Sequence, residues 1–106
     1  MNGFQITFYT QQNRQHQHKP MADWLIDIAI ELQLHGATQM AASKGVGKHH
    51  HLHSAHFFEL ADQPQTVTMI VSDNEANRLL ERIQQEQVEI FYVKNPVTFG
   101  ILGHAE

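Results

Sequence analysis

The order of strand-like and helix-like segments is the feature that most constrains the fold of this chain. Residues 4–10 (FQITFYT) alternate apolar and polar side chains and are rich in aromatic and β-branched types, which is typical of a half-buried strand. Over residues 21–34 the apolar side chains recur at helical spacing, so an amphipathic helix is predicted after Pro20. Gly36 is expected to end it in a left-handed conformation. The segment 11–19 has no apolar residue and is expected to be a mobile polar loop.

The rest of the chain continues with strands around a second helix. The predicted elements are a short strand over 37–42, a strand over 66–71 (TVTMIV), a helix over 74–87 and a strand over 88–93 (VEIFYV). Ser72 and Glu75 have the spacing of a capping box, which favours a helix start at this point. Asn95 and Pro96 are expected to stop or bend the last strand, and residues 97–101 are a candidate for a short edge strand.

This β-α-β-β-α-β order predicts an α+β protein with a ferredoxin-like, four-stranded antiparallel sheet. Right-handed crossovers would place both helices on one face of that sheet. The 106 residues carry no linker-like segment, so a single domain over residues 1–106 is expected. The first, third and fourth predicted strands carry apolar side chains on both faces. We therefore expect neighbouring subunits to cover the face without helices.

Charge and composition exclude several classes of function. Seven Lys and Arg against eleven Asp and Glu give a net charge of −4, which argues against binding to nucleic acid. There is no cysteine, so disulfides, thiolate metal sites and thiol nucleophiles are excluded. The first residues lack the pattern of a signal peptide, and no apolar run is long enough to span a bilayer. The protein is expected to be cytoplasmic and not inserted in a membrane.

The sequence carries no recognisable catalytic motif. Ser43, Ser54 and Ser72 all lack the Gly-x-Ser-x-Gly context of a nucleophilic serine. Gly45 and Gly47 lack the third glycine and the following helix of a dinucleotide-binding fingerprint. We therefore expect that the protein is not an enzyme.

Several short motifs resemble those of a known family. Residues 35–47 (HGATQMAASKGVG) resemble the second-strand region of the PII signalling proteins, and residues 89–94 (EIFYVK) resemble their fourth strand. The pattern is closer still to a sister group of PII-like proteins of uncharacterised function. The residues that match that group are Lys19-Pro20-Met21, Gly36-Ala37-Thr38, Gly45, Gly47 and His53. The resemblance covers roughly residues 4–95.

The resemblance implies a homotrimer with ligand clefts between subunits, where the PII proteins bind adenine nucleotides. Thr38 would then face the adenine. The segment 44–56 would correspond to the flexible T-loop, which contacts a target such as a membrane transporter or an enzyme. The residues that the resemblance places near phosphate or another anion are Gly45, Val46, Gly47, Lys48 and His53. Exposed backbone amides and a cation are suited to holding an anion.

The chain departs from the PII pattern at the phosphate. Residues 85–89 (QEQVE) stand where PII proteins have a Gly-Asp-Gly-Lys loop, with Glu89 at the lysine position. Residues 97–103 lack the arginines of the PII tail. A triphosphate would meet few cations here, so the expected ligand is a smaller nucleotide, another anion or a metal.

A histidine-rich run supplies the alternative hypothesis. The candidate metal ligands are His49, His51, His53 and His56. Neutral imidazole is a common ligand of zinc, copper and nickel, and alternate residues of an extended segment point the same way. The chain would then be a divalent-metal-binding protein of CutA-like architecture. Two other interpretations remain open: a solvated polar loop, and an anion-binding role for His53.

Overall fold

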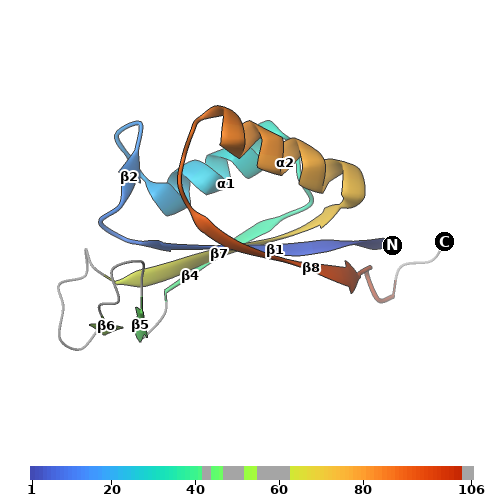
Figure 1. Cartoon of the computed structure of the whole chain (residues 1–106). Helices are drawn as coiled ribbons and strands as arrows, with labels where there is room; N and C mark the ends of the chain where they lie inside the picture. Colours follow the sequence, from blue (N-terminus) through green and yellow to red (C-terminus); the bar gives the residue numbers. More distant parts are fainter. Residues whose placement is uncertain (42–43, 47–51, 55–62, 104–106) are drawn as a thin grey trace.

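The computed structural model describes residues 1–41, 44–46, 52–54 and 63–103. Its main sheet has four antiparallel strands in the order β4-β7-β1-β8. The strands are β1 (Asn2–Gln11), β4 (Ala37–Ala41), β7 (Pro64–Ser72) and β8 (Phe91–Thr98). Helices α1 (Met21–Glu31) and α2 (Asp73–Gln85) lie together on one face (Figure 1). The predicted ferredoxin-like arrangement is therefore confirmed.

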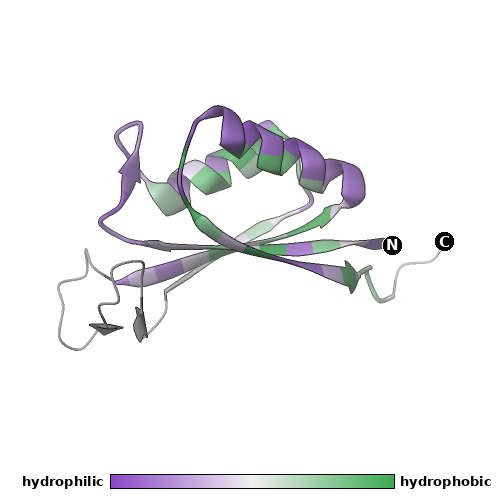
Figure 2. Cartoon of the chain, in the orientation of Figure 1, coloured by the Kyte–Doolittle hydropathy of each residue, from purple (hydrophilic) through white to green (hydrophobic). Residues whose placement is uncertain are grey.

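The hydrophobic core lies between the sheet and the two helices. Strands β1 and β7 send alternate side chains toward the helices, as their alternating sequence predicts. The largest fully buried side chains are Phe8, Ile6, Met21, Leu25, Ile28, Met69, Leu79, Val67 and Val71. Figure 2 shows hydrophobic colour where the helices meet the sheet and hydrophilic colour along the outer side of α2.

Helix α1 ends earlier than predicted, and Gly36 is not its cap. The residue with the left-handed conformation is Gln33, with φ 56°. Its N–H donates to the Ile30 carbonyl at 3.1 Å, and the N–H of Leu34 donates to the Ala29 carbonyl at 3.0 Å. These two bonds are those of a Schellman motif. They stop the helix before Gly36 is reached, so the glycine prediction was wrong.

Helix α2 begins with the predicted capping box. The Glu75 N–H donates to the Ser72 hydroxyl at 3.2 Å, and the Ser72 N–H donates to the Glu75 carboxylate at 2.8 Å. Burial raises the pKa of Glu75, but the hydrogen bonds from the Ser72 N–H and from His35 outweigh it and hold that pKa below its usual value. The stabilisation from this carboxylate is therefore present above its unfolded pKa, about 4.3, and is lost as the pH falls through the lower folded pKa.

Replacing Ser72 by alanine is expected to lower the free energy of unfolding by about 1 kcal/mol, because the Glu75 N–H loses its partner. Urea denaturation at pH 7 measures the change. Asn77→Ala is a matched control at an exposed position of the same helix, and it should change the free energy by less than about 0.5 kcal/mol. A Ser72 variant as stable as this control would contradict the role of the cap.

The segment 11–19, predicted to be a mobile loop, contains a small hairpin. Strands β2 (Gln15–His16) and β3 (Lys19–Pro20) pair antiparallel around a turn at Gln17 and His18. Polar side chains from this hairpin bond to the end of α2, which is 70 residues away in sequence. The loop prediction was wrong because these partners are not local in the sequence.

Strand β8 was predicted to begin at Val88 and to stop or bend at Pro96. Instead it begins at Phe91 and continues through Pro96 to Thr98. β8 is an edge strand that pairs only with β1 among the described strands. Proline lacks an N–H, and an edge strand tolerates that loss because one of its sides needs no ladder hydrogen bonds. Of the separate strand suggested over 97–101, residues 97 and 98 are the end of β8, and residues 99–101 form no strand.

The sheet face opposite the helices is more polar than predicted. By alternation from the core residues, β1 presents Gln5, Thr7 and Tyr9 on this open face. The Thr7 and Thr68 hydroxyls lie 3.2 Å apart and share a hydrogen bond. The Tyr9 and Phe91 rings meet edge to face at 5.6 Å, with 44% and 69% of these residues exposed. β1 therefore carries mainly polar side chains here, whereas β8 contributes apolar ones.

Candidate functional site

The segment between β4 and β7 carries its own small hairpin. Strands β5 (Lys44–Val46) and β6 (Leu52–Ser54) pair antiparallel, with Gly45 opposite His53 and Val46 opposite Leu52. Figure 1 shows this hairpin on the side of the sheet away from the helices. The register brings together Gly45 and His53, two predicted ligand-binding residues that are separated in the sequence. A glycine has no Cβ, so its backbone leaves room for a ligand beside the facing residue.

Thr38 lies on the edge strand that leads into this segment. Its cross-strand partner is Thr68, which in turn pairs with Thr7 on β1. The three threonines form a line across the open face from the edge strand to the middle of the sheet. Thr38 is exposed, and its hydroxyl can both donate and accept a hydrogen bond. This chemistry suits the polar edge of a heterocyclic base.

The remaining predicted ligands fall outside the described residues. They are Gly47, Lys48, His49, His51 and His56. Among the residues that the structure describes, no three His, Asp or Glu side chains are grouped closely enough to hold a metal ion. The metal hypothesis for the loop histidines stays a prediction.

The connection between α2 and β8 replaces the basic phosphate loop of PII proteins with a cluster around Glu86. Glu86 accepts a hydrogen bond from His16 at 3.1 Å and from Gln17 at 2.6 Å, and its other oxygen lies 3.4 Å from Arg82. The hydrogen bond with His16 is the main reason why the pKa of Glu86 lies below its usual value. In this chain the Glu86 carboxylate thus occupies the region of the α2–β8 connection.

Other cations near this cluster also have partners within the chain. Arg82 donates to Glu31 at 2.9 Å, which helps to raise the pKa of its guanidinium. Arg14 donates to the Glu89 carbonyl, and Lys19 pairs with Asp27. The Glu86 cluster could not be predicted from the sequence, because its members come from distant segments without a common motif. The missing basic loop is visible in the sequence, and it is the signal that this region differs from PII.

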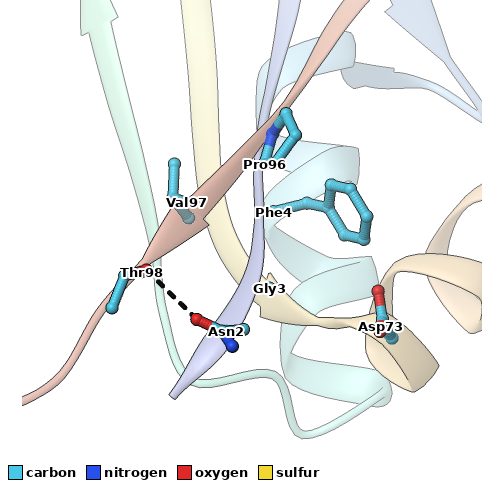
Figure 3. A pocket seen from close by; sticks show the side chains of 7 residues that line it. All are labelled: Asn2, Gly3, Phe4, Asp73, Pro96, Val97 and Thr98. Carbon is cyan, nitrogen blue, oxygen red and sulfur yellow. Dashed lines mark hydrogen bonds between the residues drawn. The ribbon is translucent and has the colours of Figure 1, made fainter.

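A hollow lies at the end of the sheet away from the β5–β6 hairpin, beside the N-terminus. It has a volume of about 330 Å³ and is lined by Asn2, Gly3, Phe4, Asp73, Pro96, Val97 and Thr98 (Figure 3). The Thr98 hydroxyl donates to the Asn2 side-chain oxygen at 3.1 Å across its rim. None of the predicted ligand-binding residues lines this hollow, so it is separate from the candidate site.

The fold and the position of the loop hairpin can be compared with known proteins. Residues 3–98 match the family model DUF190, described as "Uncharacterized ACR, COG1993". The chain belongs to this family. None of the curated proteins matches the chain.

Solved structures of PII-like proteins share the fold over most of this DUF190 chain. One is CPII, a nitrogen regulatory PII-like protein from Thiomonas intermedia K12, bound to ADP, AMP and bicarbonate. It is 16% identical with a TM-score of 0.71, over 95% of this chain and 91% of that one. Another is a putative PII-like signaling protein from Thermus thermophilus, 19% identical with a TM-score of 0.67, over 91% of this chain and 87% of that one. The apo form of CPII is 16% identical with a TM-score of 0.53, over 92% of each chain.

These comparisons confirm the resemblance to PII-like proteins that the short motifs indicated. The described helices include none that is long and apolar enough to cross a membrane. The segment 44–56, which holds β5 and β6, lies between β4 and β7 in the sequence, and its correspondence to the T-loop stays a prediction.

Proposed function

We propose that the protein is a PII-like regulator that binds an adenine nucleotide or another small anion beside β4 and the β5–β6 hairpin. The observation that carries the proposal is the register of that hairpin, which pairs Gly45 with His53. The ligand lies at a cleft between subunits of a homotrimer. Its binding orders the loop, and the loop then acts on a cytoplasmic face of a transporter or on an enzyme.

The charges of the chain favour a ligand with few negative charges. The described cations nearest to the α2–β8 connection are engaged by Glu31, Glu86, Asp27 and the Glu89 carbonyl. An imidazole and backbone amides are sufficient for one or two anionic oxygens but weak against a triphosphate. Structures of this fold bound to ADP, AMP and bicarbonate supply ligands of this size to test.

The open face of the sheet supports the trimer. It holds a line of threonines and an exposed ring pair, Tyr9 and Phe91, on a chain of only 106 residues. A domain of this size leaves much of its apolar surface exposed to water unless it associates. Covering this face with neighbouring subunits would also place Thr38 at a subunit boundary, beside the proposed ligand.

Isothermal titration calorimetry with ADP, AMP and bicarbonate tests the proposal. Binding of at least one of them is expected, and His53→Ala should weaken it at least about tenfold, because a hydrogen bond to a charged group contributes about 1.5–3 kcal/mol. Thr38→Val should weaken the binding of the nucleotides but leave the binding of bicarbonate unchanged, since only the nucleotides carry a base.

His18→Asn is the matched control for the histidine variant. His18 is exposed, lies on the β2–β3 turn, and has φ 65°, a conformation that asparagine tolerates. It should bind like the unmodified protein. The absence of binding heat for all three ligands would overturn the proposed function, as would a His53 variant that binds like the control.

A further inference from the structure

The tip of the β2–β3 hairpin is bonded to the end of α2 through one carboxylate. Glu86, which caps the end of α2, accepts hydrogen bonds from His16 Nε2 at 3.1 Å and from Gln17 Nε2 at 2.6 Å on the same oxygen. Arg82 lies 3.4 Å from the other oxygen and steadies the carboxylate from within α2. We call the contact of His16 and Gln17 with Glu86 the hairpin latch.

The turn that the latch holds is strained. Gln17 and His18 have φ values of 52° and 65°, in the left-handed region that glycine and asparagine occupy far more readily than other residues. Two consecutive residues in this region persist only where the surroundings enforce them. The Gln17 side chain is itself part of the latch, so the turn is expected to relax when Glu86 releases it.

The latch also brings an imidazole against the only tryptophan of the chain. The His16 ring meets the Trp24 ring edge to face, with 4.4 Å between centroids. Trp24 is 4% exposed and belongs to the core face of α1. His16 is more accessible, with 20% of its side chain exposed, so a proton can reach it from solvent.

We propose that the hairpin latch is sensitive to pH and that protonation of His16 closes it. A neutral imidazole gives the Glu86 carboxylate a hydrogen bond from an uncharged donor, whereas an imidazolium adds the attraction between two opposite charges. The hairpin is therefore held more tightly at acidic pH than at alkaline pH.

The charged groups around His16 agree with this direction. His16 faces the Glu86 carboxylate of the α2 end. Arg82 of α2 pairs with that carboxylate and also donates to Glu31 at the end of α1. On the hairpin the cross-strand partner of His16 is Lys19, whose ammonium group pairs with Asp27. Glu86 is therefore the carboxylate in direct contact. The pKa of Glu86 is lowered chiefly by its hydrogen bond with His16, so the pair persists until the pH falls through that lower value.

Opening of the latch would affect the point where the chain between β4 and β7 enters β7. The N–H of Gln12 donates to the Gln63 carbonyl at 2.9 Å, immediately before β7 begins. The N–H of Met21, the first residue of α1, donates to the Arg14 carbonyl at 2.7 Å. The hairpin is thus bonded at its start to the end of the β4–β7 segment and at its finish to α1.

Trp24 fluorescence of the full chain between about pH 5 and pH 8, the range in which imidazole changes charge, tests the latch. A protonated imidazole in contact with an indole quenches its emission, so emission should fall as the pH drops. His16→Gln keeps an amide donor for Glu86 but cannot titrate, and should abolish the change. His18→Asn, at the neighbouring exposed histidine, should retain it.

Limited trypsin digestion at about pH 6 and about pH 8, each corrected for the activity of trypsin on a small peptide substrate, gives an independent measurement. Glu86→Gln removes the negative charge, so cleavage of the Arg14–Gln15 bond should become several-fold faster than in the unmodified protein at about pH 6, where the latch is closed, and less so at about pH 8. Circular dichroism confirms that the variant is folded. Emission that does not depend on pH, or that depends on it equally in His16→Gln, would overturn the proposal, and so would an unchanged cleavage rate in a folded Glu86 variant.

Discussion

Replacing Phe8 by alanine is expected to lower the free energy of unfolding by about 3–5 kcal/mol, a large part of the roughly 5–15 kcal/mol of an ordinary domain. Phe8 is 1% exposed on β1, between β7 and β8, and its ring lies 6.3 Å from that of Tyr92. Removing the ring leaves a cavity at the centre of the sheet, under both helices. Urea denaturation followed by circular dichroism measures the loss, seen as a lower midpoint at unchanged slope.

Tyr9→Ala is the matched control because it removes the next aromatic ring on the opposite face. Tyr9 is 44% exposed, and its described ring contact is with Phe91. Its loss should lower the free energy of unfolding by only about 1 kcal/mol, the value of an edge-to-face ring pair. Under the proposed trimer it should also weaken association in sedimentation equilibrium, whereas Phe8→Ala should act first on folding. Equal destabilisation by the two variants would contradict the assignment of Phe8 to the core face.

The parts of the fold that the sequence predicted are those determined by local patterns. β7 alternates buried and less buried side chains throughout, and β1 does so from Gln5 onward; this alternation directly encodes which face is buried. The start of α2 is encoded by Ser72 and Glu75, which satisfy each other's backbone donors. Because these signals are short-range, they require no knowledge of the rest of the structure.

The parts that the sequence did not predict depend on distant partners. Pro96 can lie within β8 only because β8 is an edge strand, and strand order is a property of the whole sheet. The hairpin at Gln15–Pro20 depends on Glu86, which is far away in the sequence. Gly36 was expected to cap α1 because glycine has the best intrinsic preference, but Gln33 is the residue at the position where the last turn ends.

The candidate site shows the same division. Thr38, Gly45 and His53 were predicted from motifs that resemble PII-like proteins, and the structure adds the register that sets Gly45 against His53. The Glu86 cluster could not be predicted, because the carboxylate and its donors share no spacing pattern. The absence of a basic loop before β8 was visible in the sequence. The structure shows what stands there instead: the Glu86 carboxylate, bonded to His16 and Gln17 and paired with Arg82.

Replacing Gly3 by alanine is the second change with a large expected effect. Gly3 pairs with Ser72 on β7 and with Val97 on β8, so it lies between two strands at the start of β1. A Cβ at this position would overlap the Val71 carbonyl oxygen and lie 2.8 Å from Cε1 of Phe99. The Phe99 ring can rotate away, but the Val71 carbonyl belongs to the backbone of the neighbouring strand. Strand β1 must therefore shift away from β7.

That shift would be transmitted to the start of α2, because Ser72 is both the partner of Gly3 and the N-cap of the helix. We expect a loss of about 3 kcal/mol in the free energy of unfolding, at the upper end of the usual range for overpacking. Gly36→Ala is the control, since a Cβ there meets nothing within 4 Å and its φ is not in the left-handed region. It should be neutral or slightly stabilising, because alanine reduces the freedom of the unfolded chain. If Gly3→Ala is as stable to unfolding as Gly36→Ala, then the Val71 carbonyl oxygen does not lie close enough to Gly3 to exclude a Cβ, and the strand pairing there is looser than described.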